Sequence, residues 1–500
     1  MEGRCDMAVP VKREQAAVWG DDPACGHELA APFQTHYCSY IRVPKLLSLQ
    51  GPRSGRTDEL PLLLALQAAE LWLKLLVDHV DRVVPALKAR DMEETALLLL
   101  LNRCSVVIEL LEKQTEVAAM VLLPAGHAPP VRLAIGEDGG PSRQFAALAE
   151  VNRRLRETLD GLAAQAEAAA AGGEYLDRFQ AWQPRFRQLL ERFRPPERQD
   201  GAVDYVEYLR LDELLTLQSG VKAEWTPEGE QPAALAVAGS ISPDELMFII
   251  VHQAFELWFK AMLHELDGAR HDLLSRPAAI APAAARLHRL VHLQKLLLQQ
   301  IQVPATMQPL DFLQFRGETR VVDGRKLRRG LSPASGTESY QFREIEIAAG
   351  LRGNEEYRRF LEGAPGLYIR FLTPRLEERL TEPSLRELFD RLLEERSIRD
   401  PLEIFTPAAA PNPHADLARL AERLLEFDKY FQFWRYEHLT MVHAMIGGKA
   451  GTGFLGPGYL RETAGLGRQS DHERLYAGIQ TRPRFFPRLW AARTRMGGYG

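Results

Sequence analysis

The segment Ile241-Ser-Pro-Asp-Glu-Leu-Met-Phe-Ile-Ile-Val-His-Gln-Ala-Phe-Glu-Leu-Trp-Phe-Lys260 decides the fold, because its apolar residues fall at the spacing of one long helix. Ser242 and Glu245 stand three residues apart, which is the spacing of a capping box. Pro243 lies between them and suits the first helical position. The segment therefore predicts a helix that begins at residue 243.

One face of this helix is aromatic and carries a single histidine. Its members recur every three or four residues and so share that face: Phe248, His252, Phe255 and Phe259. The imidazole of His252 is either a core side chain bonded to a backbone group or a group aimed rigidly at a ligand. Periodicity alone leaves both interpretations open.

The composition is that of an ordinary globular chain with two or more domains. Of 500 residues, 46% are hydrophobic and 26% are charged, and the net charge is −5. A negative balance argues against general attraction to nucleic acid or acidic membranes. The most apolar run, Ala96–Leu101, is too short to span a bilayer, and residues 1–33 show no secretory signal. We therefore expect a soluble protein with neither nucleic acid nor membrane as a partner.

Cysteine usage points to a reduced setting. The four cysteines all lie in the first quarter of the chain, at Cys5, Cys25, Cys38 and Cys104. None forms a CxxC pair, so neither a zinc ribbon nor a disulfide framework is indicated. A cytoplasmic location is expected.

An altered copy of the central segment occurs earlier in the chain. Residues 57–74 match residues 243–260 at Asp-Glu-Leu and at Gln-Ala-x-Glu-Leu-Trp-x-Lys, and a Tyr-x-x-Tyr motif followed by Leu-Leu-x-Leu-Gln precedes each. So many matches in one order indicate an internal duplication. In the first copy Leu62 and Leu66 replace Phe248 and His252. Leucine can neither form hydrogen bonds nor bind metal, so the first copy is predicted to be scaffold only.

The duplication and the composition divide the chain into four parts. Residues 1–33 are expected to be a poorly ordered leader, 34–165 the degenerate first copy, 166–202 a helical segment ending in a Pro-Pro linker, and 203–500 the catalytic second copy. Strand signals are nearly absent, which predicts an all-α class. Amphipathic stretches of the second copy lie at residues 245–275, 282–302, 338–350, 354–363, 384–396 and 415–446.

Five separated blocks of the second copy resemble the haem enzyme tryptophan 2,3-dioxygenase. The blocks cover residues 203–495 in order: Tyr205–Gln218, Phe248–Lys260, Leu310–Arg316 with Leu331–Gly336 and Gln341–Arg343, Phe431–Gly447, and Lys449–Gly453 with Gly458–Arg461 and Phe485–Trp490. The resemblance implies a haem-binding helical bundle of the tryptophan/indoleamine dioxygenase type, here in tandem duplication. It further implies haem b as cofactor, and L-tryptophan or a similar indole amino acid and O2 as substrates.

The resemblance assigns the haem ligand to His438. This residue falls in the family's Trp-Arg-Tyr/Phe-x-His register, and Trp434 of the same block is expected to contact the cofactor. A neutral imidazole on a rigid helix can bind iron axially and leave the opposite face open. His443, a little over one turn further on, is the rival ligand.

The same resemblance assigns the substrate pocket. His252 matches the distal histidine that hydrogen-bonds the indole N–H, and Phe248 matches an aromatic wall. Arg316 matches the arginine that holds the substrate carboxylate, for which a planar guanidinium offers two parallel donors, and Phe312 lies one turn before it. A surface salt bridge is the alternative for Arg316. Thr452 lies between two glycines in a loop that this family closes over its substrate.

Three further positions concern subunit contacts. In this family, the residues that match Tyr205, Tyr208 and Leu209 reach from one subunit into a neighbour's active site, and the enzyme is typically a tetramer of intertwined pairs. The first copy keeps Tyr37, Tyr40 and Ile41 at the corresponding positions. One hypothesis is that the first copy acts as a built-in partner, so that a homo-oligomer of two chains mimics the tetramer; the other is that these tyrosines anchor helices.

Two departures from the family pattern leave the substrate open. The expected lid continues as Phe454-Leu-Gly-Pro457, and a basic insertion, Gly317–Gly330, follows Arg316. The leading hypothesis is a dioxygenase that cleaves the indole C2–C3 bond of L-tryptophan to give N-formyl-L-kynurenine. The alternatives are a haem hydroxylase acting on tryptophan or a related aromatic amino acid in specialised metabolism, and a non-catalytic haem sensor. A di-metal carboxylate bundle is set aside because its paired Glu-x-x-His motifs are missing.

Overall fold

A computed structural model describes most of the chain outside the N-terminal segment and several loops. The described residues are 37–90, 92–124, 126–135, 141–160, 166–194, 202–220, 226–227, 235–236, 242, 244–316, 318–329, 336, 339–351, 374–406, 410–447 and 484–498. The predicted leader, the predicted helical stretch 354–363, Thr452 and the segment Phe454–Pro457 lie outside them.

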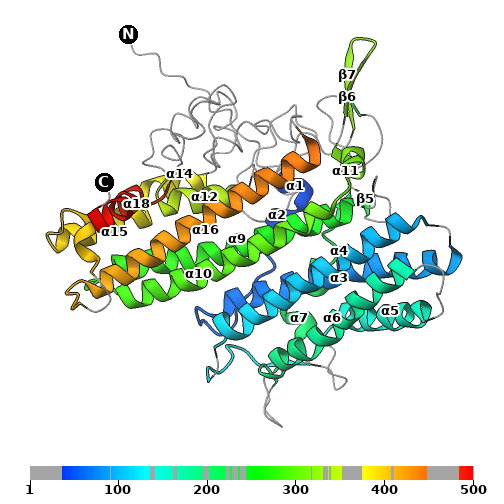
Figure 1. Ribbon diagram of the computed structural model, residues 1–500, viewed down its shortest axis with the longest axis horizontal. Coiled ribbons are helices and arrows are strands. Elements are labelled where there is room, and N and C mark those ends of the chain that lie inside the picture. The colour runs from blue at the N-terminus through cyan, green and yellow to red at the C-terminus, as the bar shows by residue number, and fades with distance from the viewer. Residues whose placement is uncertain are drawn as a thin grey trace.

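Two groups of long helices lie side by side in one bundle (Figure 1). The first helix group consists of α3 (Glu59–Ala89), α4 (Glu94–Val117), α5 (Arg143–Leu159) and α6 (Ala166–Glu191). The second helix group consists of α9 (Glu245–Leu274), α10 (Ile280–Ile301), α12 (Tyr340–Ala349) and α16 (Ala415–Ile446). Helices α3 and α9 contact each other where the groups meet. The all-α prediction is confirmed.

Shorter elements complete the bundle. The remaining helices are α1 (Tyr37–Ile41), α2 (Val43–Leu47), η3 (Ala118–Leu122), α7 (Tyr205–Tyr208), α8 (Leu211–Leu214), η5 (Pro304–Thr306), α11 (Pro309–Arg316), α14 (Pro374–Thr381), α15 (Leu385–Glu395), η8 (Pro401–Ile404), α18 (Pro487–Arg495) and η11 (Met496–Gly498). The strands are β1 (Leu133–Ala134), β2 (Val203–Asp204), β3 (Ser219–Gly220), β4 (Thr226–Pro227), β5 (Leu235–Ala236), β6 (Glu318–Val322) and β7 (Arg325–Arg329). Strands β1 and β2 pair in parallel, whereas the β3–β5 pair and the β4–β7–β6 sheet are antiparallel.

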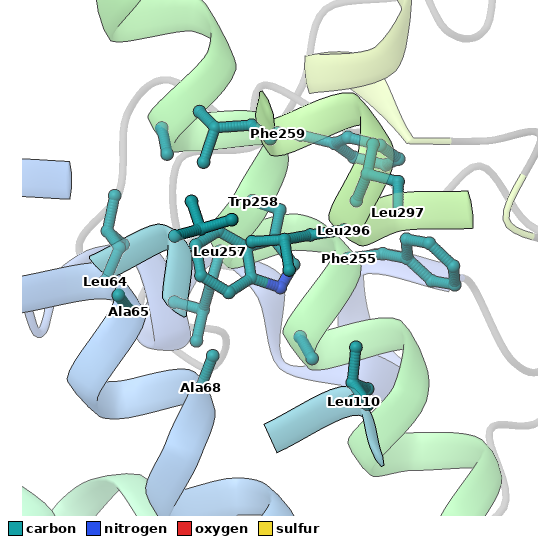
Figure 2. Close-up of a cluster of buried hydrophobic side chains, with 14 of the residues drawn as sticks. Leu64, Ala65, Ala68, Leu110, Phe255, Leu257, Trp258, Phe259, Leu296 and Leu297 are labelled. Atoms are coloured by element: carbon teal, nitrogen blue, oxygen red, sulfur yellow. The ribbon is translucent and has the colours of Figure 1, made fainter. Parts of the chain in front are cut away.

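One apolar core joins the two helix groups. In Figure 2, Leu64 of α3 and Leu110 of α4 lie in the same cluster as Leu257 and Trp258 of α9 and Leu296 of α10. Helices α3 and α9 are long and apolar enough to cross a membrane, but 83% and 78% of their most apolar windows are buried inside the protein. A helix that is apolar all round is expected where protein covers every side of it. We therefore describe both as central core helices.

The two groups exchange their short leading helices. The Tyr37 hydroxyl of α1 donates to Glu256 of α9 at 2.8 Å, and the Tyr205 hydroxyl of α7 donates to Glu70 of α3 at 3.0 Å. The same exchange occurs one turn further on, where Tyr40 donates to Glu245 at 2.9 Å and Tyr208 donates to Glu59 at 2.8 Å. Each group is thus covered by the leading segment of the other.

Matching contacts extend the correspondence beyond α3 and α9. Gln114 of α4 donates to the Ala65 carbonyl, and Gln300 of α10 donates to the Val251 carbonyl. The two donors are separated by the same number of residues as the two acceptors. The run Phe179-Gln-Ala-Trp182 on α6 matches Phe431-Gln-Phe-Trp434 on α16. Helices α4 and α6 therefore correspond to α10 and α16.

Two local expectations need correction. Helix α9 begins at Glu245 with Asp244 as its N-cap, two residues later than the capping-box spacing predicted. The Ser242 hydroxyl instead accepts from the Asp244 amide at 3.3 Å, so it stabilises the turn before the helix. The second correction concerns the basic insertion, for which no strand was predicted.

The insertion forms a β-hairpin of β6 and β7 that extends from the end of α11 (Figure 1). Asp323 and Gly324 at its turn have positive φ angles of 52° and 74°. Two successive positive angles define the two-residue turn that matches strand twist, and Asp-Gly is a preferred pair for it. The turn was readable from the sequence as a hairpin signal.

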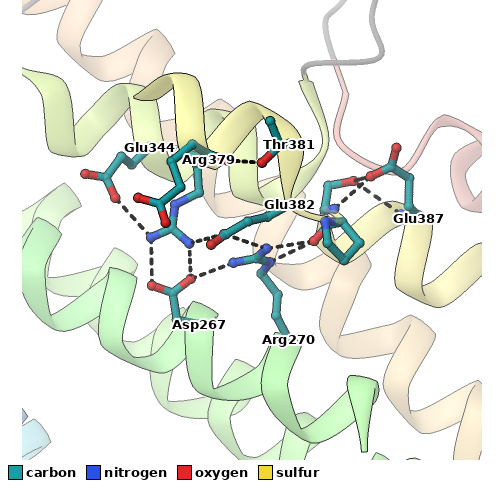
Figure 3. Close-up of polar contacts among 10 residues, drawn as sticks. Asp267, Arg270, Glu344, Arg379, Thr381, Glu382 and Glu387 are labelled. Atoms are coloured by element: carbon teal, nitrogen blue, oxygen red, sulfur yellow. Dashed lines mark hydrogen bonds and ion pairs between the residues drawn. The ribbon is translucent and has the colours of Figure 1, made fainter. Parts of the chain in front are cut away.

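A polar network fixes the remote half of α9. Arg379 of α14 donates to Asp267 at 2.6 and 2.9 Å and to Glu344 of α12 at 3.0 Å. Arg270 donates to Glu382 at 2.9 Å (Figure 3). These pairs tie α12 and α14 to α9, and so support the end of the helix that lies away from His252.

Candidate functional site

His252 lies on α9 with its tautomer set by the backbone. Its Nδ1 lies 2.7 Å from the Phe248 carbonyl oxygen, which can only accept, so Nδ1 carries the proton. Burial lowers the pKa of His252 to about 4, and the contact with the Phe248 carbonyl opposes this only partly. The ring is therefore neutral near pH 7. Its Nε2 presents a lone pair, which can accept a hydrogen bond from an N–H group.

An aromatic wall from α9 and α11 surrounds this imidazole. The Phe248 ring centroid lies 4.1 Å from that of His252, 5.3 Å from that of Phe315 and 5.9 Å from that of Phe312. The wall is buried, with Phe315 fully so. Sequence reasoning assigned Phe248 and Phe312 but gave Phe315 no role. Its position three residues after Phe312, on the same face of α11, was the available signal.

Arg316 ends α11 one turn after Phe312, on the same side of the helix. Burial lowers its pKa, yet a guanidinium stays charged at any physiological pH. The wall therefore carries a fixed positive charge at one end. A carboxylate is the group that such a charge recognises best.

The second histidine of the site, His438, lies on α16. Its ring stacks on Trp434 with centroids 5.2 Å apart and an angle of 16°. Burial, together with a smaller contribution from neighbouring His252, lowers the pKa of His438 to about 4, so this imidazole is also neutral. Trp434 packs in turn against Phe255 and Phe259 of α9, at 5.9 and 6.3 Å. Helices α9 and α16 thus bring the two histidines to one region.

The leading segment next to His252 comes from the first copy. The Tyr37 ring lies 5.8 Å from His252, and the Tyr40 ring lies 6.3 Å from Phe248. The structure places Tyr205, Tyr208 and Leu209, which sequence matching assigned to substrate binding, against the first copy instead. Tyr205 donates to Glu70 and Tyr208 donates to Glu59. The Leu209 carbonyl accepts from Gln67 at 3.0 Å.

The exchange of leading segments explains this difference. Sequence matching aligns the two Tyr-x-x-Tyr motifs but carries no information on which central helix each motif covers. The structure shows that each motif covers the helix of the other copy, through the four tyrosine–glutamate hydrogen bonds. In this chain, the tyrosines beside the aromatic wall are therefore Tyr37 and Tyr40.

A buried carboxyl group supports the wall from behind. Glu256, one turn after His252, accepts from Tyr37 at 2.8 Å and from Gln341 at 2.7 Å. Burial raises its pKa, although hydrogen bonds from Gln341, Ser339 and Tyr37 oppose the shift. Sequence reasoning missed this group, whose only signal was an acidic residue inside an apolar helix. It joins α1, α9 and α12 at the level of His252.

The corresponding place in the first helix group is filled by hydrocarbon. Trp182 stacks on Phe186 at 4.9 Å and 20°, nearly the geometry of Trp434 on His438. Phe186 thus occupies the position of His438, as Leu66 occupies that of His252. Phe186 is 2% exposed and also stacks on Phe145. Neither of these side chains can ligate a metal.

The described residues include groups on α16 that would suit a haem. His438 is half-buried, and no hydrogen-bond partner of its imidazole lies among the described residues, so a ring nitrogen remains for iron. The Trp434 indole N–H beside it is buried without an acceptor in the described part of the chain. A haem propionate is an acceptor of the required kind. The rival His443 also has a buried Nε2 without a partner in the described part of the chain, so the preference for His438 rests on its stacking with Trp434 and on its proximity to His252.

The space beside His252 is kept narrow by backbone. A Cβ atom placed on Gly336 would lie 3.5 Å from Cδ2 and 3.6 Å from Nε2 of His252. The chain thus approaches the imidazole closely from the side of its accepting nitrogen. With the aromatic wall on α11, the arrangement suits a flat apolar ring that carries one N–H donor.

Comparisons with known proteins agree with this geometry. The sequence model of the tryptophan 2,3-dioxygenase family matches residues 195–381 and 375–494. A tryptophan 2,3-dioxygenase from Herpetosiphon aurantiacus is 35% identical over 315 residues, which cover 58% of this chain and 98% of the relative. Those from Nocardioides sp. and Saccharopolyspora erythraea are each 32% identical, over 60% and 59% of this chain and 96% and 93% of the relatives. The family model leaves residues 1–194 unmatched.

Proposed function

Because the chain belongs to the tryptophan 2,3-dioxygenase family, we propose that it opens the indole ring of L-tryptophan with O2 to give N-formyl-L-kynurenine. The observation that carries the proposal is the neutral His252 with its accepting Nε2 inside an aromatic wall. The aromatic wall favours a flat substrate ring, and the accepting Nε2 of His252 favours a ring that carries an N–H donor. A tyrosine-like ring carries no N–H at that place.

We propose haem b as the cofactor, held by His438 and flanked by Trp434. When bound, its iron supplies the binding and activation of O2. Among the described residues of the site, the two imidazoles are weak bases because burial lowers the pKa of each to about 4, and Glu256 is engaged behind the wall. Replacing His438 with Gln is expected to abolish the haem Soret band, whereas replacing His443 with Gln is expected to preserve it.

The remaining residues orient the substrate. His252 accepts from the indole N–H, while Phe248, Phe312 and Phe315 pack on the ring. Arg316 pairs with the carboxylate, and we propose that Thr452 contacts the amino-acid end from the lid. Correct placement of a bound substrate can supply a large share of catalysis. Each role is an orienting one.

We infer that the first copy acts as a built-in partner and continues through α6. Phe186 in place of His438 makes it inert, while its Tyr37 and Tyr40 complete the wall around Phe248 and His252. Two chains would then reproduce the four-copy arrangement typical of the family. A cytoplasmic location is consistent with the buried, unpaired Cys104, whose thiol pKa burial raises to about 12.

The turnover assay uses haem-loaded, reduced protein with L-tryptophan and isotopically labelled O2. Two labelled oxygen atoms in a ring-opened product are expected, as read by mass spectrometry. One labelled atom in an intact indole would replace the proposal by a hydroxylase. Unchanged tryptophan in the presence of bound haem would favour a sensor, and other aromatic amino acids would be tested next.

The exchanged tyrosines provide a matched test of the built-in partner. Tyr37→Phe and Tyr40→Phe remove hydroxyls that face the second copy, whereas Tyr205→Phe and Tyr208→Phe remove their counterparts at the inert copy. The first pair is expected to raise KM for L-tryptophan and the second pair to leave it unchanged. Equal effects from both pairs would show that the tyrosines only anchor helices.

A further inference from the structure

A fully buried arginine of the first copy joins the two walls of the proposed pocket. Arg103 of α4 is 0% exposed, and its Nη1 donates to Oδ1 of Asp244 at 2.7 Å. Its Nη2 lies 3.3 Å from Oδ2 of the same carboxylate. Asp244 is the N-cap of α9, and its carbonyl accepts from the Phe248 amide at 3.0 Å. The arginine thus holds the end of α9 that carries the aromatic wall.

The same guanidinium holds the entrance to α11. Nε donates to the Thr306 hydroxyl at 2.9 Å, and Nη2 donates to the Thr306 carbonyl at 3.0 Å. Asp244 also accepts from the Gln308 amide at 3.3 Å, and the Gln308 carbonyl accepts from the Phe312 amide at 3.0 Å. Helix α11, which carries Phe312, is therefore fixed to α9 through a cluster of hydrogen bonds around Arg103, a residue of the first copy. We call this cluster the Arg103 node.

The fifth donor of Arg103 is used as well. Nη1 lies 3.3 Å from Nε2 of His79 on α3, whose Nδ1 lies 3.2 Å from the Asp78 carboxylate. Burial lowers the pKa of His79 to about 4, so its ring is neutral and Nε2 accepts. All five guanidinium N–H groups then have acceptors, and they come from three separate segments. Such a group has one low-energy position.

The duplication shows that this node is not a general feature of the fold. The counterpart of Arg103 is Arg289, which pairs within its own copy with Glu265 at 2.8 Å through two nitrogens. The counterpart of Glu265 is His79, which is neutral and therefore leaves Arg103 to pair across the copies. Asp58, the counterpart of Asp244, pairs with Arg56 at the surface. Among the described residues, such a cross-copy node is found only at the end of the bundle that carries His252.

We propose that Arg103 is a positioning residue for substrate binding: the inert copy sets the distance between α9 and α11, and so between His252 and Arg316. The proposal rests on the proposed function, because it assigns the two ends of the substrate to these two helices. It gives the first copy a role in the pocket separate from that of its tyrosines. Arg103 itself touches no substrate.

The test compares Arg103→Lys with Arg289→Lys in the haem-loaded full chain. Lysine keeps Asp244 paired with a positive charge but cannot bridge Asp244 and both Thr306 acceptors. Arg103→Lys is expected to raise KM for L-tryptophan roughly three- to tenfold with a smaller change in kcat, because a shift between α9 and α11 weakens substrate binding without removing a group that touches the substrate. Arg289→Lys is expected to leave KM within about twofold of the parent. A KM that is unchanged in Arg103→Lys, or equally raised in both, would overturn the proposal.

A second readout separates this proposal from the proposed function. Hydrogen–deuterium exchange is expected to quicken at residues 244–252 and 308–316 in Arg103→Lys and to stay unchanged there in Arg289→Lys. This readout needs no turnover, so it stands even if the parent protein leaves tryptophan untouched. If Arg103→Lys fails to fold, Thr306→Val removes one acceptor without leaving a buried charge unpaired. Unchanged exchange in that variant would equally refute the positioning role.

Discussion

At the scale of single residues, the two copies supply their own controls. The helix that carries His252 also exists with Leu66 at the same position in the first copy, where the leucine is buried in the core and His252 is half-buried. A leucine at residue 252 is therefore compatible with the helix and its packing. The polar atom of His252 can be removed without removing the wall.

His252→Leu is expected to keep the fold and the haem Soret band while lowering kcat/KM for L-tryptophan at least tenfold, about 1.4 kcal/mol for one lost hydrogen bond. The physical reason is that the indole N–H would lose its acceptor. Steady-state kinetics measures the change, with Leu66→Ile as the control in the first copy. Unaltered kinetics in His252→Leu would remove this residue from the substrate site.

Glu70→Gln is expected to stabilise the protein at alkaline pH. Burial raises the pKa of Glu70 to about 7, while hydrogen bonds from Ser142 and Tyr205 oppose the shift. The folded state therefore holds a proton that the unfolded state releases near its usual pKa of 4.5. The contribution of this bound proton to the free energy of unfolding is fully present below pH 4.5 and is lost as pH rises through about 7.

The amide that Glu70→Gln introduces needs no proton, so the variant should gain up to about 3 kcal/mol in free energy of unfolding at pH 8 and little at pH 5. Guanidinium denaturation at the two pH values measures it. Glu157→Gln, an exposed change of the same charge, is the control. If the stability gained by Glu70→Gln is no larger at pH 8 than at pH 5, the raised pKa of Glu70 would be contradicted.

At the scale of elements, α6 and α16 show how one helix position can be structural or functional. Both carry the run Phe-Gln-x-Trp, and one turn later α16 has His438 and α6 has Phe186. The stacking on tryptophan is retained in both, at 5.2 and 4.9 Å. In α6 a phenylalanine thus stands where α16 carries the proposed ligand, and the stacking on tryptophan is kept.

Phe186→Ala is expected to lower the free energy of unfolding by about 3–5 kcal/mol, because it leaves a cavity among Phe145 and Trp182. The substrate pocket lies in the other helix group, so KM for L-tryptophan should not change in the folded protein. Calorimetry and kinetics measure the two effects. Met120→Ala, at a side chain that is 67% exposed, should change stability by less than about 0.5 kcal/mol. A raised KM in Phe186→Ala would show that the helix groups are coupled more widely than the Arg103 node.

At the scale of the whole molecule, the exchange of leading segments occurs within one chain. Tyr37 reaches Glu256 and Tyr205 reaches Glu70 without a second polypeptide. The tyrosines that border the described part of the proposed pocket therefore come from the same chain. An enzyme that borrows these groups from a neighbour would lose them on dissociation.

Turnover per chain is expected to stay constant on dilution, including through any dissociation of oligomers. Mass photometry gives the oligomeric state at each concentration, and initial rates give kcat. Rates that fall together with the oligomer fraction would show that a second chain contributes to the pocket. Tyr37→Phe, assayed over the same range, should keep its higher KM at every concentration.

The helix pattern was largely accessible from sequence, and the roles of the site residues stay predictions. Helices α9, α10, α12, α15 and α16 lie where periodicity predicted them, because a buried face imposes its spacing on the residues of one segment. The start of α9 was misplaced by two residues, since Ser242 and Glu245 have capping-box spacing but the Ser242 hydroxyl bonds the Asp244 amide. Phe315 and Glu256 were missed because their roles depend on what packs against them.

The sequence by itself determined the all-α class and the family, and it predicted the duplication and the two histidines, since each of these is written in local spacing or in ordered blocks along one segment. Only the tertiary structure decided which tyrosines lie beside His252, because the covering of α9 by α1 and of α3 by α7 is a long-range packing choice. The same holds for Arg103, whose counterpart Arg289 has an identical side chain and a different partner. What surrounds a charged group in space, and not its position in a repeat, sets which charge it pairs with.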